Sequence, residues 1–143
     1  MQGTHETESE AATEVLGALL WKTLRAPACV LLEAPMGTGK TALARGLVRA
    51  AGHEGEVPSP TYAIVQPYET GGGEGPPLYH LDLYRLNSPS ELAELGLDDM
   101  LDAGIVLVEW PERAAGWWPG DAWRIAGSVL PDGTRRWVIG RTA

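Results

Sequence analysis

A glycine-rich octapeptide at residues 34–41, with the sequence Ala-Pro-Met-Gly-Thr-Gly-Lys-Thr, constrains the fold of this chain more than any other segment. It follows residues 28–32, an unbroken apolar run that is typical of a strand covered on both faces. It leads into residues 40–51, whose apolar side chains recur at helical spacing. The order strand, glycine loop and amphipathic helix is half of a βαβ unit, and it predicts an α/β fold.

The same octapeptide carries the strongest chemical signal. It matches the P-loop pattern G-x-x-x-x-G-K-[ST], with Ala34 in place of the first glycine. Glycines let the backbone curl so that successive N–H groups face a phosphate, and the following helix adds its positive end. We expect Lys40 to reach the β- and γ-phosphates of a nucleotide and the Thr41 hydroxyl to bind Mg²⁺. The other loop residues expected to contact the nucleotide are Met36, Gly37, Thr38 and Gly39.

Two further helices and a second buried strand are predicted around this unit. Residues 10–24 have helical spacing, with an apolar face formed by Ala12, Val15, Leu16, Leu19 and Leu20. Residues 88–91 read Ser-Pro-Ser-Glu, which has capping-box spacing with proline at the first helical position. Residues 104–108 form a second continuous apolar strand.

The remaining segments predict strands added to a parallel core. Residues 61–68 and 78–83 alternate in polarity across the glycine-rich connection 69–77, which indicates an antiparallel hairpin with a long, flexible loop. Weaker strands are expected around 123–125 and 136–139. The predicted fold is therefore a three-layer α/β domain of the P-loop NTPase type, with a mostly parallel sheet and added antiparallel hairpin strands.

Composition bounds the class of protein. The chain has 143 residues and a net charge of −8, so we expect one domain spanning 1–143 that is a poor nucleic-acid binder by itself. Cys29 is the single cysteine, which excludes an internal disulfide and fits a reducing compartment. The acidic N-terminus does not read as a signal peptide, and no apolar run is long enough to span a membrane. We expect a soluble, cytoplasmic protein without membrane contact.

Carboxylates at predicted strand ends are the candidate partners of the loop, because a P-loop NTPase needs an acid near Mg²⁺. Glu109 ends the strand at 104–108 and is the metal-side candidate; the alternative is a solvated strand-end glutamate. Asp82 is a candidate for orienting the attacking water, or else a partner of Arg85. His80 shares the strand face of Asp82, where a hydrogen-bonded structural histidine is the commoner case.

Two other groups of residues have open roles. Thr61 follows two prolines just after the P-loop helix, the place of a switch threonine, with an ordinary turn as the alternative. Because the chain has no phenylalanine, Trp123 and Trp137 are expected in the core. The remaining candidates, for either core or partner surface, are Trp110, Trp117 and Trp118.

These motifs together resemble the TsaE (YjeE) family, the P-loop ATPases of bacterial tRNA threonylcarbamoyladenosine biosynthesis. The resemblance covers residues ~9–112 and combines the loop with four other segments. They are Thr13 with Gly17, Ser59-Pro60-Thr61-Tyr62, His80-Leu81-Asp82-Leu83-Tyr84-Arg85-Leu86, and Glu109-Trp110-Pro111-Glu112. Ala34-Pro35 departs from the family's usual Gly-Asp, and Arg135 or Arg136 resembles a family arginine beside the nucleotide.

The resemblance implies a slow ATPase that binds ATP or ADP with Mg²⁺. It places Thr41 and Glu109 on the metal, has Asp82 assist hydrolysis, and puts Ser9 and Thr13 near the nucleotide. The catalytic residues are then expected to be Lys40, Asp82 and Glu109. Implied partners are the TsaB and TsaD proteins, of which TsaD transfers the threonylcarbamoyl group, and tRNA is contacted mainly through the complex.

Two other classes of function use the same phosphate chemistry. A small-molecule kinase would need a substrate pocket and usually a mobile, arginine-rich lid, yet the arginines here are scattered. A nucleotide-sensing module without enzymatic activity would tolerate loss of the carboxylates of Asp82 and Glu109.

Overall fold

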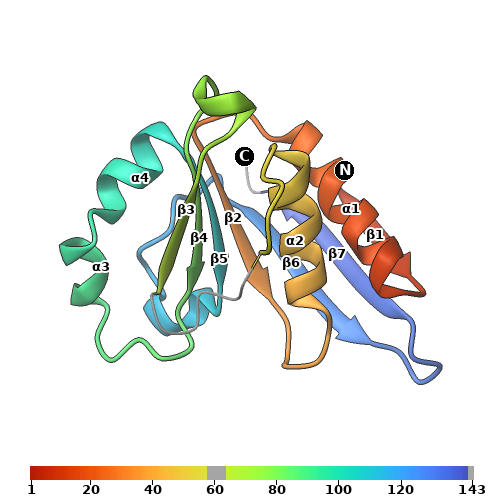
Figure 1. The fold of residues 1–143 in the computed structure, drawn as a ribbon. Helices are drawn as coiled ribbons and strands as arrows, with labels where there is room; N and C mark the ends of the chain where they lie inside the picture. Colours follow the sequence, from red (N-terminus) through yellow and green to blue (C-terminus); the bar gives the residue numbers. More distant parts are fainter. Residues whose placement is uncertain (58–63, 142–143) are drawn as a thin grey trace.

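The computed structural model describes residues 1–57 and 64–141, which form one seven-stranded sheet with helices on both faces (Figure 1). The strands are β1 (Gly3–Thr7), β2 (Ala28–Glu33), β3 (Val65–Tyr68), β4 (Leu78–Asp82), β5 (Ile105–Glu109), β6 (Trp123–Val129) and β7 (Arg135–Arg141). The helices are α1 (Glu10–Thr23), α2 (Lys40–Ala50), α3 (Ser90–Glu94) and α4 (Leu97–Ala103), with short 3₁₀ turns η1 (Gly71–Gly73) and η2 (Pro111–Ala114).

The sheet has a parallel centre and antiparallel edges. The strand order is β1-β7-β6-β2-β5-β4-β3. β6, β2, β5 and β4 run parallel to one another, whereas β3, β7 and β1 are antiparallel to their neighbours. The chain segments that follow β2, β4 and β5 therefore leave the sheet at one edge, the lower one in Figure 1. The predicted fold class, a mostly parallel sheet with added antiparallel strands, is confirmed.

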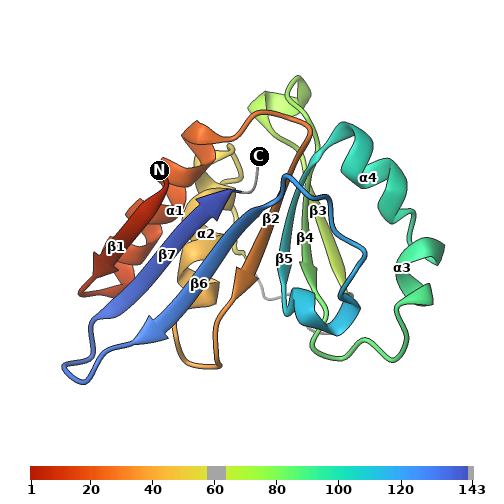
Figure 2. The same ribbon diagram turned by 180° about the vertical axis from the view of Figure 1, so that it is seen from behind.

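Two apolar clusters make the fold three-layered. On β2, Val30 and Leu32 belong to the cluster shared with α1 and α2, while Cys29 and Leu31 belong to the cluster under α3 and α4. This alternation follows from the period of two along a strand, and it explains why β2 reads as a continuous apolar run. Figure 2 shows the sheet from behind, with α1 and α2 on its far side.

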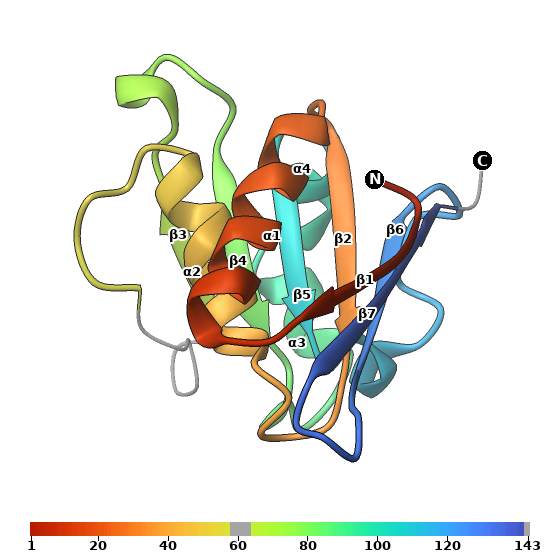
Figure 3. The same ribbon diagram turned by 90° about the vertical axis from the view of Figure 1, so that its right-hand side faces the viewer.

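Helix α1 forms where predicted, and Leu16 and Leu20 of its predicted apolar face are buried, but Val15 and Leu19 of that face are not. Val15 and Leu19 are 60% and 47% exposed. The buried stripe consists of Thr13, Leu16, Gly17 and Leu20. A Cβ at Gly17 would collide with the backbone carbonyl of Leu43, so a side-chain-free position is what lets α1 lie against α2, as Figure 3 shows.

Strand β1 and helix α4 were not predicted. The residues of β1 are polar and largely exposed, so the sequence has no alternation of apolar and polar residues that would predict a strand there. It is fixed by pairing with β7 and by a buried chain of hydrogen bonds. In that chain Trp137 Nε1 donates to Thr7 Oγ1 (3.2 Å), and the Thr7 and Thr13 hydroxyls lie 2.7 Å apart.

The other predicted elements are present with small changes. The antiparallel pairing of β3 with β4 is confirmed, although residues 61–63 of the predicted strand lie outside the described residues. Helix α3 begins at Ser90, and the Ser88 hydroxyl accepts the N–H of Ser90 (3.4 Å) rather than that of Glu91, so the predicted capping box is not formed. Trp123 and Trp137 are buried in the core, as expected. In the described ranges, no helix is long and apolar enough to cross a bilayer.

Gly46→Ala tests the close approach of α1 and α2. A Cβ at Gly46 would collide with the backbone of Glu14, which no side-chain rotation can relieve. We expect the free energy of unfolding to fall by about 2 kcal/mol or more, and the melting temperature by about 5 °C or more. Gly140→Ala in β7 is the control, because its Cβ meets nothing within 4 Å. Equal melting temperatures for the two variants would contradict this packing.

Thiol labelling tests the burial of β2. Burial, together with the negative charge of Asp121, raises the pKa of the Cys29 thiol to about 12, while the positive charge of Arg124 acts in the opposite direction. The reactive thiolate is therefore nearly absent in the folded protein at mildly alkaline pH. We expect Ellman's reagent to label the native protein very slowly and the guanidinium-unfolded protein rapidly and completely. Fast stoichiometric labelling of the native protein would contradict the position of Cys29.

Candidate functional site

The glycine loop between β2 and α2 is a closed turn. Gly37 and Gly39 have φ values of +80° and +107°, the left-handed region that glycine adopts without strain. The Thr38 hydroxyl donates to the carbonyl of Pro35 (2.7 Å), and its N–H points to the same oxygen (3.3 Å). The buried Thr38 side chain therefore shapes the loop from within.

Helix α2 starts directly at the end of this loop. The first hydrogen bond of the helix runs from the N–H of Leu43 to the carbonyl of Gly39 (3.1 Å). The N–H groups of residues 40–42 therefore have no acceptor within the helix. Gly39 contributes no side-chain cap. The positive end of the helix thus faces the loop, as anion binding requires.

Lys40 is folded back over the loop. Its Nζ donates to the carbonyl of Ala34 (2.8 Å) and lies 3.7 Å from the ring centroid of Trp110. Only 7% of the residue is exposed. The carbonyl and the aromatic face therefore replace part of the water that an ammonium group loses on burial.

Carboxylates surround this ammonium group at longer range. Burial lowers the pKa of Lys40 from its ordinary value, while the negative charges of Glu109, Asp82 and Glu112 act in the opposite direction. Glu109 is the strongest of these three influences. The carboxylates at the ends of β4 and β5 thus partly offset the effect of burial on the pKa of Lys40.

Asp82 and Glu109 are brought together by strand register. They pair across the parallel strands β4 and β5, so they leave the sheet side by side at its carboxyl edge. Both are buried, and both lie on the face that Leu107 and Leu78 turn toward α2. Asp82 Oδ1 accepts the backbone N–H of Tyr84 (3.0 Å).

The loop, the lysine and the two carboxylates line one hollow of about 390 Å³, which we call the lysine-side pocket. Its lining residues are Met36, Gly37, Gly39, Lys40, Thr41, Asp82, Tyr84, Glu109 and Trp110. Three segments separated in sequence therefore meet at the residues predicted to handle phosphate, metal and water.

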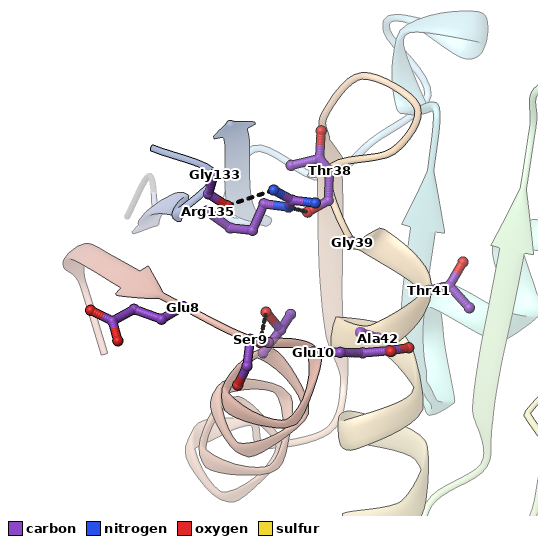
Figure 4. Close-up of a pocket in the computed structure, with 10 residues that line it drawn as sticks. Glu8, Ser9, Glu10, Thr38, Gly39, Thr41, Ala42, Gly133 and Arg135 are labelled. Atoms are coloured by element: carbon purple, nitrogen blue, oxygen red, sulfur yellow. Dashed lines mark hydrogen bonds between the residues drawn. The ribbon is translucent and has the colours of Figure 1, made fainter. Parts of the chain in front are cut away.

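A second hollow of about 380 Å³, the arginine-side pocket, lies on the other flank of the same loop (Figure 4). Its lining residues are Glu8, Ser9, Glu10, Thr13, Thr38, Gly39, Thr41, Ala42, Gly133 and Arg135. Ser9 caps α1 by accepting the N–H of Ala12 (3.0 Å). Thr41 lines both pockets, and in Figure 4 its side chain points away from Ser9 and Arg135.

Arg135, and not Arg136, is the arginine at the loop. Its Nε donates to the carbonyl of Thr38 (2.9 Å) and its Nη2 to that of Gly37 (3.3 Å). Its Nη1 donates to Gly133 within its own hairpin (2.7 Å). Arg136 instead forms an exposed ion pair with Glu6 (3.3 Å). The β6–β7 hairpin therefore holds the loop from outside.

His80 lies behind the carboxylate pair. Its Nε2 is 2.6 Å from Glu109 Oε2, with both side chains almost fully buried. This is the hydrogen-bonded histidine that was the commoner expectation for His80. Glu109 is consequently a buried, bonded carboxylate, which contradicts the alternative of a solvated strand end.

The structure adds residues to the predicted site and leaves one outside it. Thr61 lies beyond the described residues. Glu8 and Glu10 also line the arginine-side pocket, and no sequence motif indicated this because the pocket forms only where the start of α1 meets the glycine loop. Trp110 covers Lys40, and its place directly after Glu109 was the available signal.

The donor set fits a nucleotide with magnesium. The hydroxyl of the exposed Thr41 and two carboxylates are hard oxygen ligands of the kind that Mg²⁺ prefers, and the ammonium group of Lys40 is a partner for phosphate. Within residues 1–57 and 64–141, no three His, Cys, Asp or Glu side chains cluster as a metal site by themselves. Phosphate oxygens and water would complete the coordination of a magnesium ion here.

Sheet order and loop position define a three-layer α/β protein with a glycine-rich loop at the carboxyl edge of its parallel strands. Residues 7–136 match the family described as "Threonylcarbamoyl adenosine biosynthesis protein TsaE". The chain belongs to the TsaE family.

Individual relatives agree with this assignment. Proteins named "tRNA threonylcarbamoyladenosine biosynthesis protein TsaE" match from Haemophilus influenzae (43% identity over 61% of this chain), Streptomyces coelicolor (44% over 68%) and Rickettsia conorii (37% over 76%). The matched part spans 54%, 66% and 61% of their respective lengths. The crystal structure of Bacillus subtilis YdiB superposes with a TM-score of 0.83, covering 100% of this chain and 87% of YdiB at 25% identity.

Arg135→Ala tests the clamp on the loop. Loss of the bonds to Gly37 and Thr38 should lower the free energy of unfolding by about 1–2 kcal/mol and speed amide hydrogen exchange in residues 36–39. Arg136→Ala is the matched control, since its surface ion pair contributes about 0–1 kcal/mol. If both variants exchange at the wild-type rate in this loop, Arg135 does not hold it.

Proposed function

We propose that this chain is the ATP-binding and slowly hydrolysing subunit that acts with TsaB and TsaD in threonylcarbamoyladenosine modification of tRNA. Membership of the TsaE family and the names of its relatives support the pathway. The geometry of the loop supports the ATPase role.

One observation carries the proposal. Lys40 and Thr41, at the start of α2, line the same hollow as Asp82 and Glu109, at the ends of β4 and β5. Phosphoryl transfer to water needs a cation on the phosphates, a metal held by oxygen ligands, and a group that positions the water. The lysine-side pocket provides a candidate for each requirement.

The residues divide these tasks as follows. Lys40 binds the β- and γ-phosphates, while the N–H groups around Gly37–Thr41 enclose them. Thr41 and Glu109 hold the magnesium ion, and Asp82 orients the attacking water. Magnesium, when bound, neutralises charge that develops on the phosphates. Ser9, Met36, Thr38 and Gly39 complete the contacts of ATP or ADP.

The negative charge of the chain supports the proposal that its partner proteins, and not this chain, make most of the contacts with tRNA. A net charge of −8 repels the phosphate backbone of tRNA, so tRNA is contacted mainly through the complex. We place this assembly in the cytoplasm. ATP hydrolysis then resets the complex between cycles, while TsaD transfers the threonylcarbamoyl group.

Lys40→Ala is the direct test. Without the ammonium group, ATP hydrolysis in the presence of TsaB and TsaD should fall at least about 100-fold, because the phosphates lose their positioned cation. Cells that depend on the variant should lose threonylcarbamoyladenosine from tRNA, measured by mass spectrometry of nucleosides. Lys22→Ala is the matched control: Lys22 is the other lysine of the chain and lies exposed in the last turn of α1.

Normal tRNA modification in cells carrying Lys40→Ala would refute the role. A screen of metabolites for phosphate transfer, with hydrolysis by water as reference, separates the ATPase from a small-molecule kinase. Transfer well above hydrolysis would favour the kinase.

A further inference from the structure

The buried contact between His80 and Glu109 goes beyond the roles assigned so far. Nε2 of His80 and Oε2 of Glu109 are 2.6 Å apart, with 2% and 5% of the two side chains exposed. In the sheet, His80 pairs with Leu107, two residues before Glu109, so the histidine lies diagonally behind the carboxylate on the same face. A charge-assisted hydrogen bond this short and dry is among the stronger polar contacts a protein makes.

The direction of this hydrogen bond follows from the carboxylate that receives it. Glu109 in its metal-binding role is a carboxylate, which only accepts, so in that role Nε2 of His80 carries the hydrogen and donates it to Glu109. Nδ1 of His80 is buried and finds no partner among the described residues. When the ring carries its hydrogen on Nε2, Nδ1 is a buried acceptor without a hydrogen bond, and no N–H group of the ring is buried without an acceptor.

Glu109 has a second neighbour that competes for it. Its charge is the largest carboxylate influence on Lys40, yet no ion pair joins the two residues in the part of the chain that the structure describes. Lys40 is held instead by the carbonyl of Ala34 and the ring of Trp110. A collapse of Glu109 onto Lys40 would cancel the phosphate-binding cation against the metal-binding anion.

We propose that His80 is a positioning residue: its Nε2–H fixes Oε2 of Glu109, so that the carboxylate is presented to the magnesium of a bound nucleotide instead of to Lys40. The inference rests on the proposed function, because it concerns how Glu109 meets the metal. Hydrogen bonds behind a metal-binding carboxylate orient it, and their loss typically weakens metal affinity about 10–100-fold.

Two amide substitutions separate positioning from packing. Both His80→Gln and His80→Asn remove the imidazole and leave a polar side chain in the same buried space. The glutamine nitrogen takes the place of Nε2 and reaches Glu109, whereas the asparagine nitrogen takes the place of Nδ1 and does not. Any loss from imperfect packing is therefore shared, while only His80→Gln keeps the donor.

The measurement is the affinity of Mn²⁺, a magnesium substitute, for the protein–ADP complex, read from the electron paramagnetic resonance of unbound Mn²⁺. Melting temperatures establish that each variant is folded. We expect His80→Asn to bind Mn²⁺ about 10–100-fold more weakly than wild type and His80→Gln to recover most of that loss. In a Glu109→Ala background, His80→Asn should add no further loss, because it acts through Glu109.

Each outcome bears on a different claim. A folded His80→Asn variant with wild-type Mn²⁺ affinity overturns the positioning role, as does equal weakening by both amides or a full additional loss in the Glu109→Ala background. Failure of the wild-type protein to bind ADP with Mn²⁺ overturns the proposed function itself.

Discussion

The buried ammonium group of Lys40 is the constraint on which the site depends. Because burying an uncompensated charge costs several kcal/mol, the ammonium group requires neighbours that accept a hydrogen bond or carry negative charge density. The Ala34 carbonyl and the Trp110 ring stabilise it in contact, and the carboxylates at the ends of β4 and β5 stabilise it from a distance. The arrangement couples the glycine loop to acids that are more than forty residues away in sequence.

The parallel sheet makes this coupling possible. Because β2, β5 and β4 run in the same direction, the glycine loop, Glu109 and Asp82 emerge at one edge. The close packing of α1 on α2 through Gly17 and Gly46 then brings the start of α1, with Ser9, to the other flank of the loop. The start of α1, helix α2 and the β6–β7 hairpin thereby flank a loop whose residues 35–37 stay exposed.

Much of the parallel centre of the sheet could be predicted from the sequence. Strands covered on both faces appear as continuous apolar runs, and a glycine-rich loop marks the boundary between β2 and α2. The face of α1 could not be predicted in full, since its buried stripe includes Thr13 and Gly17, which are chosen for close approach and hydrogen bonding rather than hydrophobicity. Strand β1 was missed because backbone pairing with β7 forms it. For the site, residue types at strand ends predicted Asp82 and Glu109, but the clamp by Arg135 and the contact of His80 with Glu109 depend on tertiary proximity.

Calorimetric titration of the purified protein with ATP and Mg²⁺ tests most directly whether the backbone around Gly37–Thr41 forms an anion cradle. We expect a saturable heat of binding with one ATP per chain, and the same stoichiometry for ADP. Absence of any binding heat with either nucleotide at millimolar concentration, from protein shown to be folded, would contradict it.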